Sequence, residues 1–375
     1  MGADPGSGSP RPGSRDACTT LRRLYDRSPG SVVHPSPDRA DVAGSGSRSR
    51  SRPRPPHRAT RTTPRERGWL TRPGRPIGFG CSVFENDRRA LPVTDPSLVE
   101  SAWRRFWNRD GWWRAVLLAV VYIAAFLGIS ALTSTLFSGM IDAKSPTSNG
   151  VSIFFGFALP VLLGAALLLL FIWSAGWWHE IFGRQPIKGS GWMWIAVALV
   201  LVPIVIHLSS TRWGELSAGV IVAYLVMGLG VGAAEELLTR GLAVNLLRKA
   251  GYGEKAVMVL SSVIFALLHM QNMIGGQPPL LTLLELPYTF GFGLMMYLVL
   301  RVTGSIIWPI LLHAATDPTT ALSSGSLGGL GEAAASASSG PLLLIASMFG
   351  YVFLVAGLIM LFFVKGRVHP RNALA

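Results

Sequence analysis

The sequence predicts an all-α polytopic membrane protein with about eight transmembrane helices behind a disordered N-terminal region. Half of the 375 residues are hydrophobic, and only 14% are charged. The mean hydropathy of +0.41 agrees with this composition. Apolar runs follow one another along the chain, most of them near the roughly 20 residues that a helix needs to cross a bilayer. These three observations together point to a membrane domain.

Residues 1–94 form an Arg-, Pro-, Ser- and Gly-rich region with too few large apolar residues to bury a core, so we predict that it is disordered. Most of the basic residues lie before Ala115, and all of those are arginine. The alternative is that this tail binds the phosphates of anionic lipid or nucleic acid, but no aromatic interleaving or folded motif supports it, and we expect no nucleic-acid partner. A natural start further downstream is an alternative. Both cysteines, Cys18 and Cys81, lie here, which excludes a disulfide or a cysteine nucleophile in the membrane domain.

The rest of the chain divides into three predicted parts. Aromatic and basic side chains mix in 95–114, which we expect to be a juxtamembrane amphipathic segment. The transmembrane domain is placed at 115–364, and a cytoplasmic tail at 365–375. The stretch 323–340, rich in Gly, Ser and Ala, predicts a flexible outer loop. Predicted spans lie at about 115–137, 151–173, 192–208, 217–247, 256–270, 280–300, 305–322 and 342–364.

The basic residues of the connections predict the orientation of the spans. Arginine and lysine gather before the first span and after the second, fourth, sixth and eighth, whereas the other side holds only Lys144 and Arg212. We therefore expect both termini in the cytoplasm of an integral multi-pass protein, which lies in the cell membrane if the source is bacterial.

The fourth predicted span, 217–247, is too long for one simple crossing at about 20 residues. Gly228, Gly230 and Gly232 mark where it can bend or let a neighbouring helix approach closely. His207, alone on the third span, is interpreted as a packing residue.

Glu235, Glu236 and Arg240 stand in an otherwise small or apolar part of the fourth span. A carboxylate in that setting is costly and suggests a function, although ordinary charges at a cytoplasmic helix end are the alternative. On a helix, Glu236 and Arg240 share a face and can pair, while Glu235 points about 100° away. We therefore assign Glu236 and Arg240 to structure and leave Glu235 free for chemistry.

His269 on the fifth span, with His313 and Asp317 on the seventh, completes the ionisable set. At about 1.5 Å per residue, Glu235, His269 and His313 each lie about 18–21 Å from the basic border of their span, so we expect them to meet. Carboxylates and imidazoles at one depth can activate a water and stabilise an oxyanion. Alternatively, the histidines only pack, and His313 and Asp317 pair to lower the cost of burial. Pro318 is expected to disturb the local helix.

These residues resemble the three motifs of the CPBP family, the CAAX proteases and bacteriocin-processing enzymes also called the Abi family. The motifs are Glu235-Glu236-x-x-x-Arg240, Phe265-x-x-x-His269 and His313-x-x-x-Asp317. The resemblance covers the motif core at 217–320, the other spans fit the eight-helix architecture less specifically, and the N-terminal region has no counterpart. Eukaryotic CAAX proteases carry Asn where this chain has Asp317. Family members accept either residue, but an ionised Asp cannot donate to an oxyanion.

The resemblance implies an intramembrane endopeptidase of the CAAX prenyl protease type, which hydrolyses a peptide bond in a membrane-associated or peptide substrate. Glu235 would be the general base for water, His269 would hold that water or share its proton, and His313 with Asp317 would face the oxyanion. The structural support would come from Glu236, Arg240 and Phe265. This glutamate mechanism needs no cofactor. Alternatively Glu235, His269 and His313 hold zinc in a metallo-endopeptidase, although a His-Glu-x-x-His motif is absent.

Two non-protease classes compete with this interpretation. A catalytically inactive polytopic scaffold or immunity protein of the same fold would need none of the motif residues. A transporter can use intramembrane acids and histidines as a proton relay, but here they gather in one site rather than in symmetry-related halves. The expected partners are the lipid bilayer and a peptide or membrane-protein substrate. For a bacterial source, peptide maturation or cleavage of another membrane protein fits better than a prenylated substrate.

Overall fold

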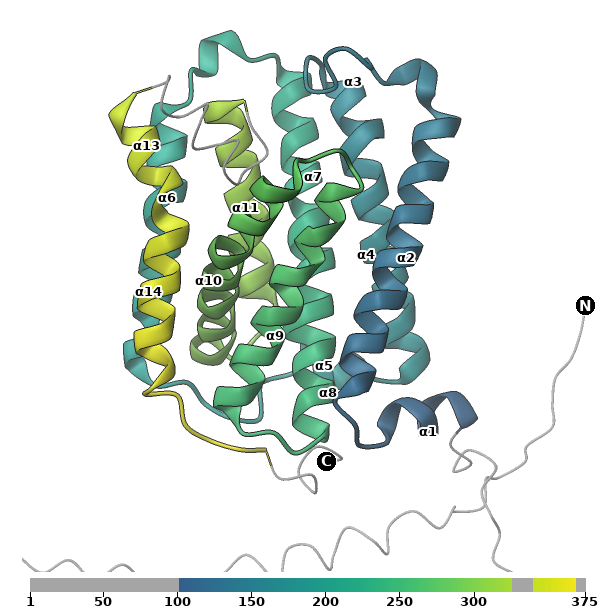
Figure 1. Ribbon diagram of the computed structural model, residues 1–375, viewed down its shortest axis with the longest axis vertical. Coiled ribbons are helices and arrows are strands. Elements are labelled where there is room, and N and C mark those ends of the chain that lie inside the picture. The colour runs from purple at the N-terminus through teal and green to yellow at the C-terminus, as the bar shows by residue number, and fades with distance from the viewer. Residues whose placement is uncertain (1–100, 326–339, 369–375) are drawn as a thin grey trace, which may run out of the picture. The chain divides into compact units, whose positions relative to one another are not determined.

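The computed structural model describes residues 101–325 and 340–368, all within the unit Arg88–Ala375. The region 1–94 lies outside the described residues, as do parts of the predicted juxtamembrane segment, outer loop and tail. The described chain consists of helices and their connections, and its only bridge of strand type, between Gly253 and Arg367, is isolated (Figure 1). The all-α prediction is confirmed.

The first half of the described chain builds the wall beside the motif helices. It contains α1 (Ala102–Asn108), α2 (Trp113–Leu136), α3 (Gly150–Ile153), the π-helical turn η3 (Phe154–Ala158), α4 (Leu159–Ala175), α5 (Trp178–Phe182) and α6 (Trp194–Ser210). The predicted juxtamembrane segment is divided, because α1 ends at Asn108 and Gly111 turns the chain with a φ of 144° before α2 begins. That backbone conformation favours glycine.

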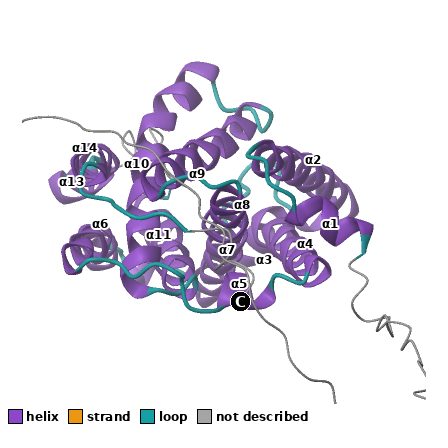
Figure 2. Ribbon diagram, turned by 90° about the horizontal axis from the view of Figure 1, so that it is seen from below, coloured by secondary structure: helices purple, strands orange, loops and turns teal. Residues whose placement is uncertain are grey.

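The second half carries the motifs. It contains α7 (Ala218–Glu236), the π-helical turn η6 (Leu237–Ala243), α8 (Val244–Lys249), α9 (Glu254–Leu268), the 3₁₀ turn η7 (His269–Met273), α10 (Pro279–Thr303), α11 (Ile307–Ser324), α13 (Pro341–Ser347) and α14 (Phe349–Leu361). Helix α7 packs against α4 and α11, and α10 packs against α9 and α14. Viewed along the helices, α7 lies among α3, α4, α8 and α11 (Figure 2).

Seven helical stretches of the described residues are long and apolar enough to cross a membrane. They match seven of the predicted spans in order. Helix α11 occupies the position of the remaining one, 305–322, but its polar residues, among them His313, Thr316 and Asp317, make it less apolar than the others. The prediction of about eight spans is therefore confirmed in outline, and the chain is an integral multi-pass membrane protein.

Glycines on α7 let the neighbouring helices approach its backbone. A Cβ atom on Gly232 would lie 2.6 Å from the carbonyl oxygen of Ile310 on α11, and one on Gly230 would lie 2.7 Å from Val161 on α4. A Cβ atom on Gly228 would collide with the ring of Pro318. Helix α7 runs unbroken past all three glycines, so they serve close packing rather than a bend.

Pro318 does not end its helix. Helix α11 continues through Pro318 to Ser324, and the buried proline ring occupies the space that the missing side chain of Gly228 leaves. His207 is buried as predicted, with its Nδ1 atom 2.7 Å from the Ser323 hydroxyl, which binds α6 to α11. Both contacts help to fix the position of α11 and hence of its motif residues.

Candidate active site

The π-helical turn η6 begins directly after the two adjacent glutamates of α7. A π turn holds one residue more than an α turn, and such turns occur frequently at functional sites. The hydroxyl of Thr239 within the turn donates to the carbonyl oxygen of Glu235 over 2.6 Å. The fourth predicted span thus continues as one helical stretch to Lys249, and the carboxylates lie where its winding changes.

Glu236 is inaccessible to solvent and contacts two groups. Its Oε2 atom lies 3.3 Å from Nε of Arg240, an ion pair without hydrogen-bond alignment, and its Oε1 atom lies 2.9 Å from Nδ1 of His313. The pair with Arg240 was predicted from the helical spacing, and it is confirmed. The contact with His313 was not predicted. It gives Glu236 a second role, because the contact fixes the orientation of that imidazole ring.

The Arg240 guanidinium is buried in a polar and aromatic setting. Its Nη2 atom donates to the carbonyl oxygen of Gly293 on α10 over 2.9 Å, and its Cζ atom lies 4.3 Å from the centre of the Phe265 ring. Gly293 leaves the space for this contact, since a Cβ atom there would lie 3.2 Å from Nη2. Arg240 therefore ties η6 to α9 and α10, in agreement with the supporting roles expected for Arg240 and Phe265.

Glu235 points into a cavity and not into the protein core. Its side chain is 19% exposed, and its Oε2 atom is buried without a hydrogen-bond donor among the described residues. The nearest ionisable partner is His313, whose Nε2 atom lies 3.9 Å from Oε2, too far for a hydrogen bond. A buried acceptor without a donor is rare and calls for an explanation such as a bound water or a catalytic role.

His313 lies between three carboxylates. Its Nδ1 atom contacts Glu236, and its Nε2 atom lies 3.9 Å from Glu235 and 3.9 Å from Oδ2 of Asp317, one helical turn further along α11. The ring of Phe292 packs edge-on against the imidazole at a centroid distance of 4.9 Å. With Nδ1 engaged and the ring held, Nε2 is the nitrogen directed at the cavity.

His269 begins η7 at the end of α9. Its Nδ1 atom lies 3.2 Å from the carbonyl oxygen of Phe265, which fixes the ring and leaves Nε2 for another partner. The Phe265 ring contacts both imidazoles, with centroid distances of 5.2 Å to His269 and 5.8 Å to His313. Phe265 is thus the spacer that separates the two histidines.

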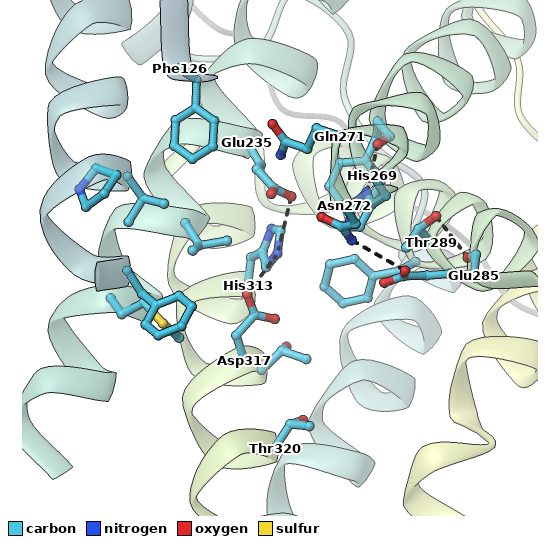
Figure 3. Close-up of a pocket in the computed structure, with 18 of the residues that line it drawn as sticks. Phe126, Glu235, His269, Gln271, Asn272, Glu285, Thr289, His313, Asp317 and Thr320 are labelled. Carbon is cyan, nitrogen blue, oxygen red and sulfur yellow. Dashed lines mark hydrogen bonds and ion pairs between the residues drawn. The ribbon is translucent and has the colours of Figure 1, made fainter. Parts of the chain in front are cut away.

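The four predicted catalytic residues all line one cavity of about 340 Å³ (Figure 3). Glu235, His313 and Asp317 lie on α7 and α11, and His269 reaches the cavity from η7. The apolar part of the wall comes from α2, η3, α4 and α7, with the residues Phe126, Phe157, Pro160, Val161, Met227 and Val231. The expectation that these polar positions meet in one site is confirmed by this geometry.

Several polar residues of the same cavity were missed in the sequence. Gln271 and Asn272 follow His269 in η7, and Glu285 lies near the beginning of α10 (Figure 3). Gln271 and Asn272 fall outside every predicted span. Glu285 stands within five residues of the start of one and resembles a boundary charge. The available signal was a lone acid in the leucine-rich stretch Leu280 to Leu286.

The zinc alternative requires the described side chains to bring at least three ligands together. Among them, no group of three or more His, Cys, Asp or Glu residues is placed to hold a metal ion. Glu235, His269 and His313 line the same cavity.

Comparison with known proteins agrees with the motifs. Residues 217–319 match the family model described as type II CAAX prenyl endopeptidase, Rce1-like. No curated protein and no solved structure gives a match. The matched segment begins at the N-cap of α7 and ends within α11, so it includes all three motifs and supports an intramembrane protease family. Over residues 217–319 the chain therefore carries the pattern of the Rce1-like type II CAAX prenyl endopeptidases, which is consistent with the CPBP family.

Proposed function

We propose that this protein is an intramembrane endopeptidase that hydrolyses a peptide bond in a membrane-associated or peptide substrate. One observation carries the proposal: the Oε2 atom of Glu235 is a buried acceptor without a donor, in a cavity that two imidazoles share. A water held there would donate to Glu235 and lie near both histidines. The matched family model supports the same class of activity.

In the proposed reaction, Glu235 removes a proton from the water while the water oxygen attacks the peptide carbonyl carbon. The carbonyl oxygen becomes an oxyanion, which Nε2 of His313 faces when that nitrogen carries a proton. Collapse of the tetrahedral intermediate breaks the carbon–nitrogen bond, and the proton on Glu235 passes to the leaving amine. His269 holds the water or shares its proton.

The remaining groups hold these residues in place. Glu236 binds Nδ1 of His313 and thereby directs Nε2 at the cavity. Asp317, 3.9 Å from that Nε2 atom, acts as an acceptor beside His313 and does not itself donate to the oxyanion. This assignment resolves the difference between Asp317 and the Asn of eukaryotic relatives by giving the donor role to the histidine.

The test is Glu235→Gln, with Glu215→Gln as the matched control, because Glu215 is 67% exposed in a surface ion pair with Arg212. Membrane and secreted peptides are compared between cells that make each form. We expect wild type and Glu215→Gln to share cleavage products that Glu235→Gln lacks, with a loss of at least about 10²-fold. Identical peptide profiles from folded, well-expressed proteins would instead support the inactive scaffold or immunity protein.

The mechanism that we propose needs no metal, and a chelator tests this. Purified protein should keep its proteolytic activity in a strong chelator, and its zinc content should be well below one ion per chain. Activity that disappears on chelation and returns with zinc would assign the reaction to a metallo-endopeptidase.

We also propose that the end of the helix bundle where Arg248, Lys249 and Arg301 lie, here called the basic end, faces the cytoplasm. A reporter fused after Arg184 should then report cytoplasm, and one inserted between residues 326 and 339 should report the outside. A cytoplasmic signal from the second fusion would contradict this orientation.

A further inference from the structure

Glu285 is a buried carboxylate that the proposed reaction does not use. It lies on α10, it is 8% exposed, and it lines the cavity that holds Glu235. In Figure 3 its carboxylate lies on the side of the cavity where His269 and Asn272 lie, away from Asp317. A substrate bound across the catalytic residues would reach it.

The hydrogen bonds of Glu285 satisfy one of its two carboxylate oxygens. Gln277 and Asn272 both donate their amide N–H groups to Oε2, over 2.8 Å and 3.4 Å. No described residue donates to Oε1, and no described lysine, arginine or histidine lies within ion-pair distance of the carboxylate. The side chain therefore presents an acceptor oxygen that has neither a donor nor a counter-charge.

A buried carboxylate without a cation costs several kcal/mol, and two neutral amides offset only part of this cost. The charge balance of the cavity wall also favours a bound cation. Three carboxylates, of Glu235, Glu285 and Asp317, line the cavity, and no described lysine or arginine does. The amide oxygen of Gln271 in the same wall is also buried without a donor. A ligand with N–H donors and a positive charge would satisfy the acceptor oxygens of Glu285 and Gln271 together.

We propose that Glu285 is a specificity-determining residue that binds a positively charged group of the peptide substrate, either a lysine or arginine side chain or a free amino terminus. This inference rests on the proposed peptidase function, since it names the substrate class of the same site. Asn272 and Gln277 orient the carboxylate by holding Oε2, which leaves Oε1 to the cation. Such a charge-assisted bond in a desolvated cavity discriminates strongly between a cation and a neutral group of the same shape.

Binding of synthetic peptides to purified Glu235→Gln protein tests the inference without relying on cleavage. The probes are acetylated and amidated apolar heptapeptides that carry lysine, norleucine or glutamate at one scanned position, and a norleucine peptide with a free amino terminus. The protein is held in nanodiscs of zwitterionic lipid, because an anionic membrane surface would itself attract the lysine peptides. We expect at least one position at which lysine binds about tenfold more tightly than norleucine, with glutamate weakest. If instead the norleucine peptide binds more tightly with a free amino terminus than with an acetylated one, the amino terminus is the cation that Glu285 binds.

Adding Glu285→Gln should abolish the preference for the cation, because glutamine keeps an acceptor for Asn272 and Gln277 but removes the charge. Glu215→Gln in its place should leave the preference unchanged. If the double variant does not fold, any order other than lysine, norleucine, glutamate in the parent protein still overturns the inference. Equal binding of all peptides, or a preference that survives Glu285→Gln, would overturn the inference.

Cleavage assays separate the two proposals. In the active protein, Glu285→Gln should raise KM for lysine peptides and leave kcat unchanged, as expected for a residue that binds substrate equally in the ground and transition states. If wild type cleaves nothing but the Glu285-dependent preference for lysine holds, the peptidase function fails while the cation site stands. If cleavage occurs without any dependence on Glu285, the peptidase function stands and the inference fails.

Discussion

Two carboxylates are buried among these helices, that of Glu254 at the basic end and that of Glu285 in the cavity. They share no type of hydrogen-bond or ion-pair partner. Glu254 accepts from Nε and Nη2 of Arg248 over 2.9 Å and 2.7 Å, from Nη1 of Arg301 over 2.9 Å, and from the Tyr297 hydroxyl. Glu285 accepts from two neutral amides and has no cation among the described residues. The acid at the basic end is thus paired with cations inside the protein, whereas Glu285 in the cavity has no such partner among the described residues.

Glu236 combines features of the paired acid at the basic end and of the acids beside the cavity. It pairs with Arg240 as a structural acid does, and it also binds His313, whose other nitrogen faces the cavity. The adjacent Glu235 has no comparable partner. The contrast therefore predicts a graded set of stabilities when each of these acids is replaced by glutamine, which preserves the shape and removes the charge.

The largest effect is expected for Glu254→Gln. Its loss leaves two buried guanidinium groups, of Arg248 and Arg301, without their counter-charge, and a broken buried pair typically costs about 3–5 kcal/mol. Unfolding of the purified protein in detergent, followed by circular dichroism as denaturant is added, measures the loss. Glu215→Gln should change nothing. A change below about 1 kcal/mol for Glu254→Gln would show that pairing does not mark the structural acids.

The sequence predicted what local spacing determines. Glu236 and Arg240 are four positions apart, and their ion pair follows from helical geometry. Equal depth in the membrane predicted that Glu235, His269 and His313 share a site, because helix rise converts sequence distance into depth. The class of the fold followed from apolar runs in the same way.

Contacts between distant segments were not predictable by spacing. Glu236 and His313 are 77 positions apart, and nothing in either segment specifies which face of α11 turns to α7. The fit of Pro318 onto Gly228 helps to fix that face, and this shape match appears only when the helices are packed. The π turn after Glu236 has no periodic signal either. The environment of Glu285 depends on Asn272 and Gln277, which donate to its carboxylate and lie outside every predicted span.

An intermediate effect is expected for Glu236→Gln. Arg240 keeps its bond to the Gly293 carbonyl and its position over Phe265, so losing the ion pair should cost about 2–3 kcal/mol, less than at Glu254. Proteolysis should also fall, because a glutamine amide holds His313 less firmly than a carboxylate does. The same unfolding series and the peptide assay measure both. A stability loss without any change in activity would remove Glu236 from the positioning of His313.

The smallest effect is expected for Glu235→Gln, whose free energy of unfolding should stay within about 0.5 kcal/mol of wild type. Two opposing terms produce this result. Neutralising a buried acceptor that has no donor relieves its desolvation, which favours the folded state. The same change removes an attraction to His313 that acts over 3.9 Å, which is longer than a hydrogen bond and therefore weaker than the contact of Glu236. The denaturant midpoint of Glu235→Gln should thus match wild type in the preparation that has lost proteolysis. A destabilisation above about 2 kcal/mol would place Glu235 with Glu254 among the structural acids, and its loss of activity would then follow from a damaged fold.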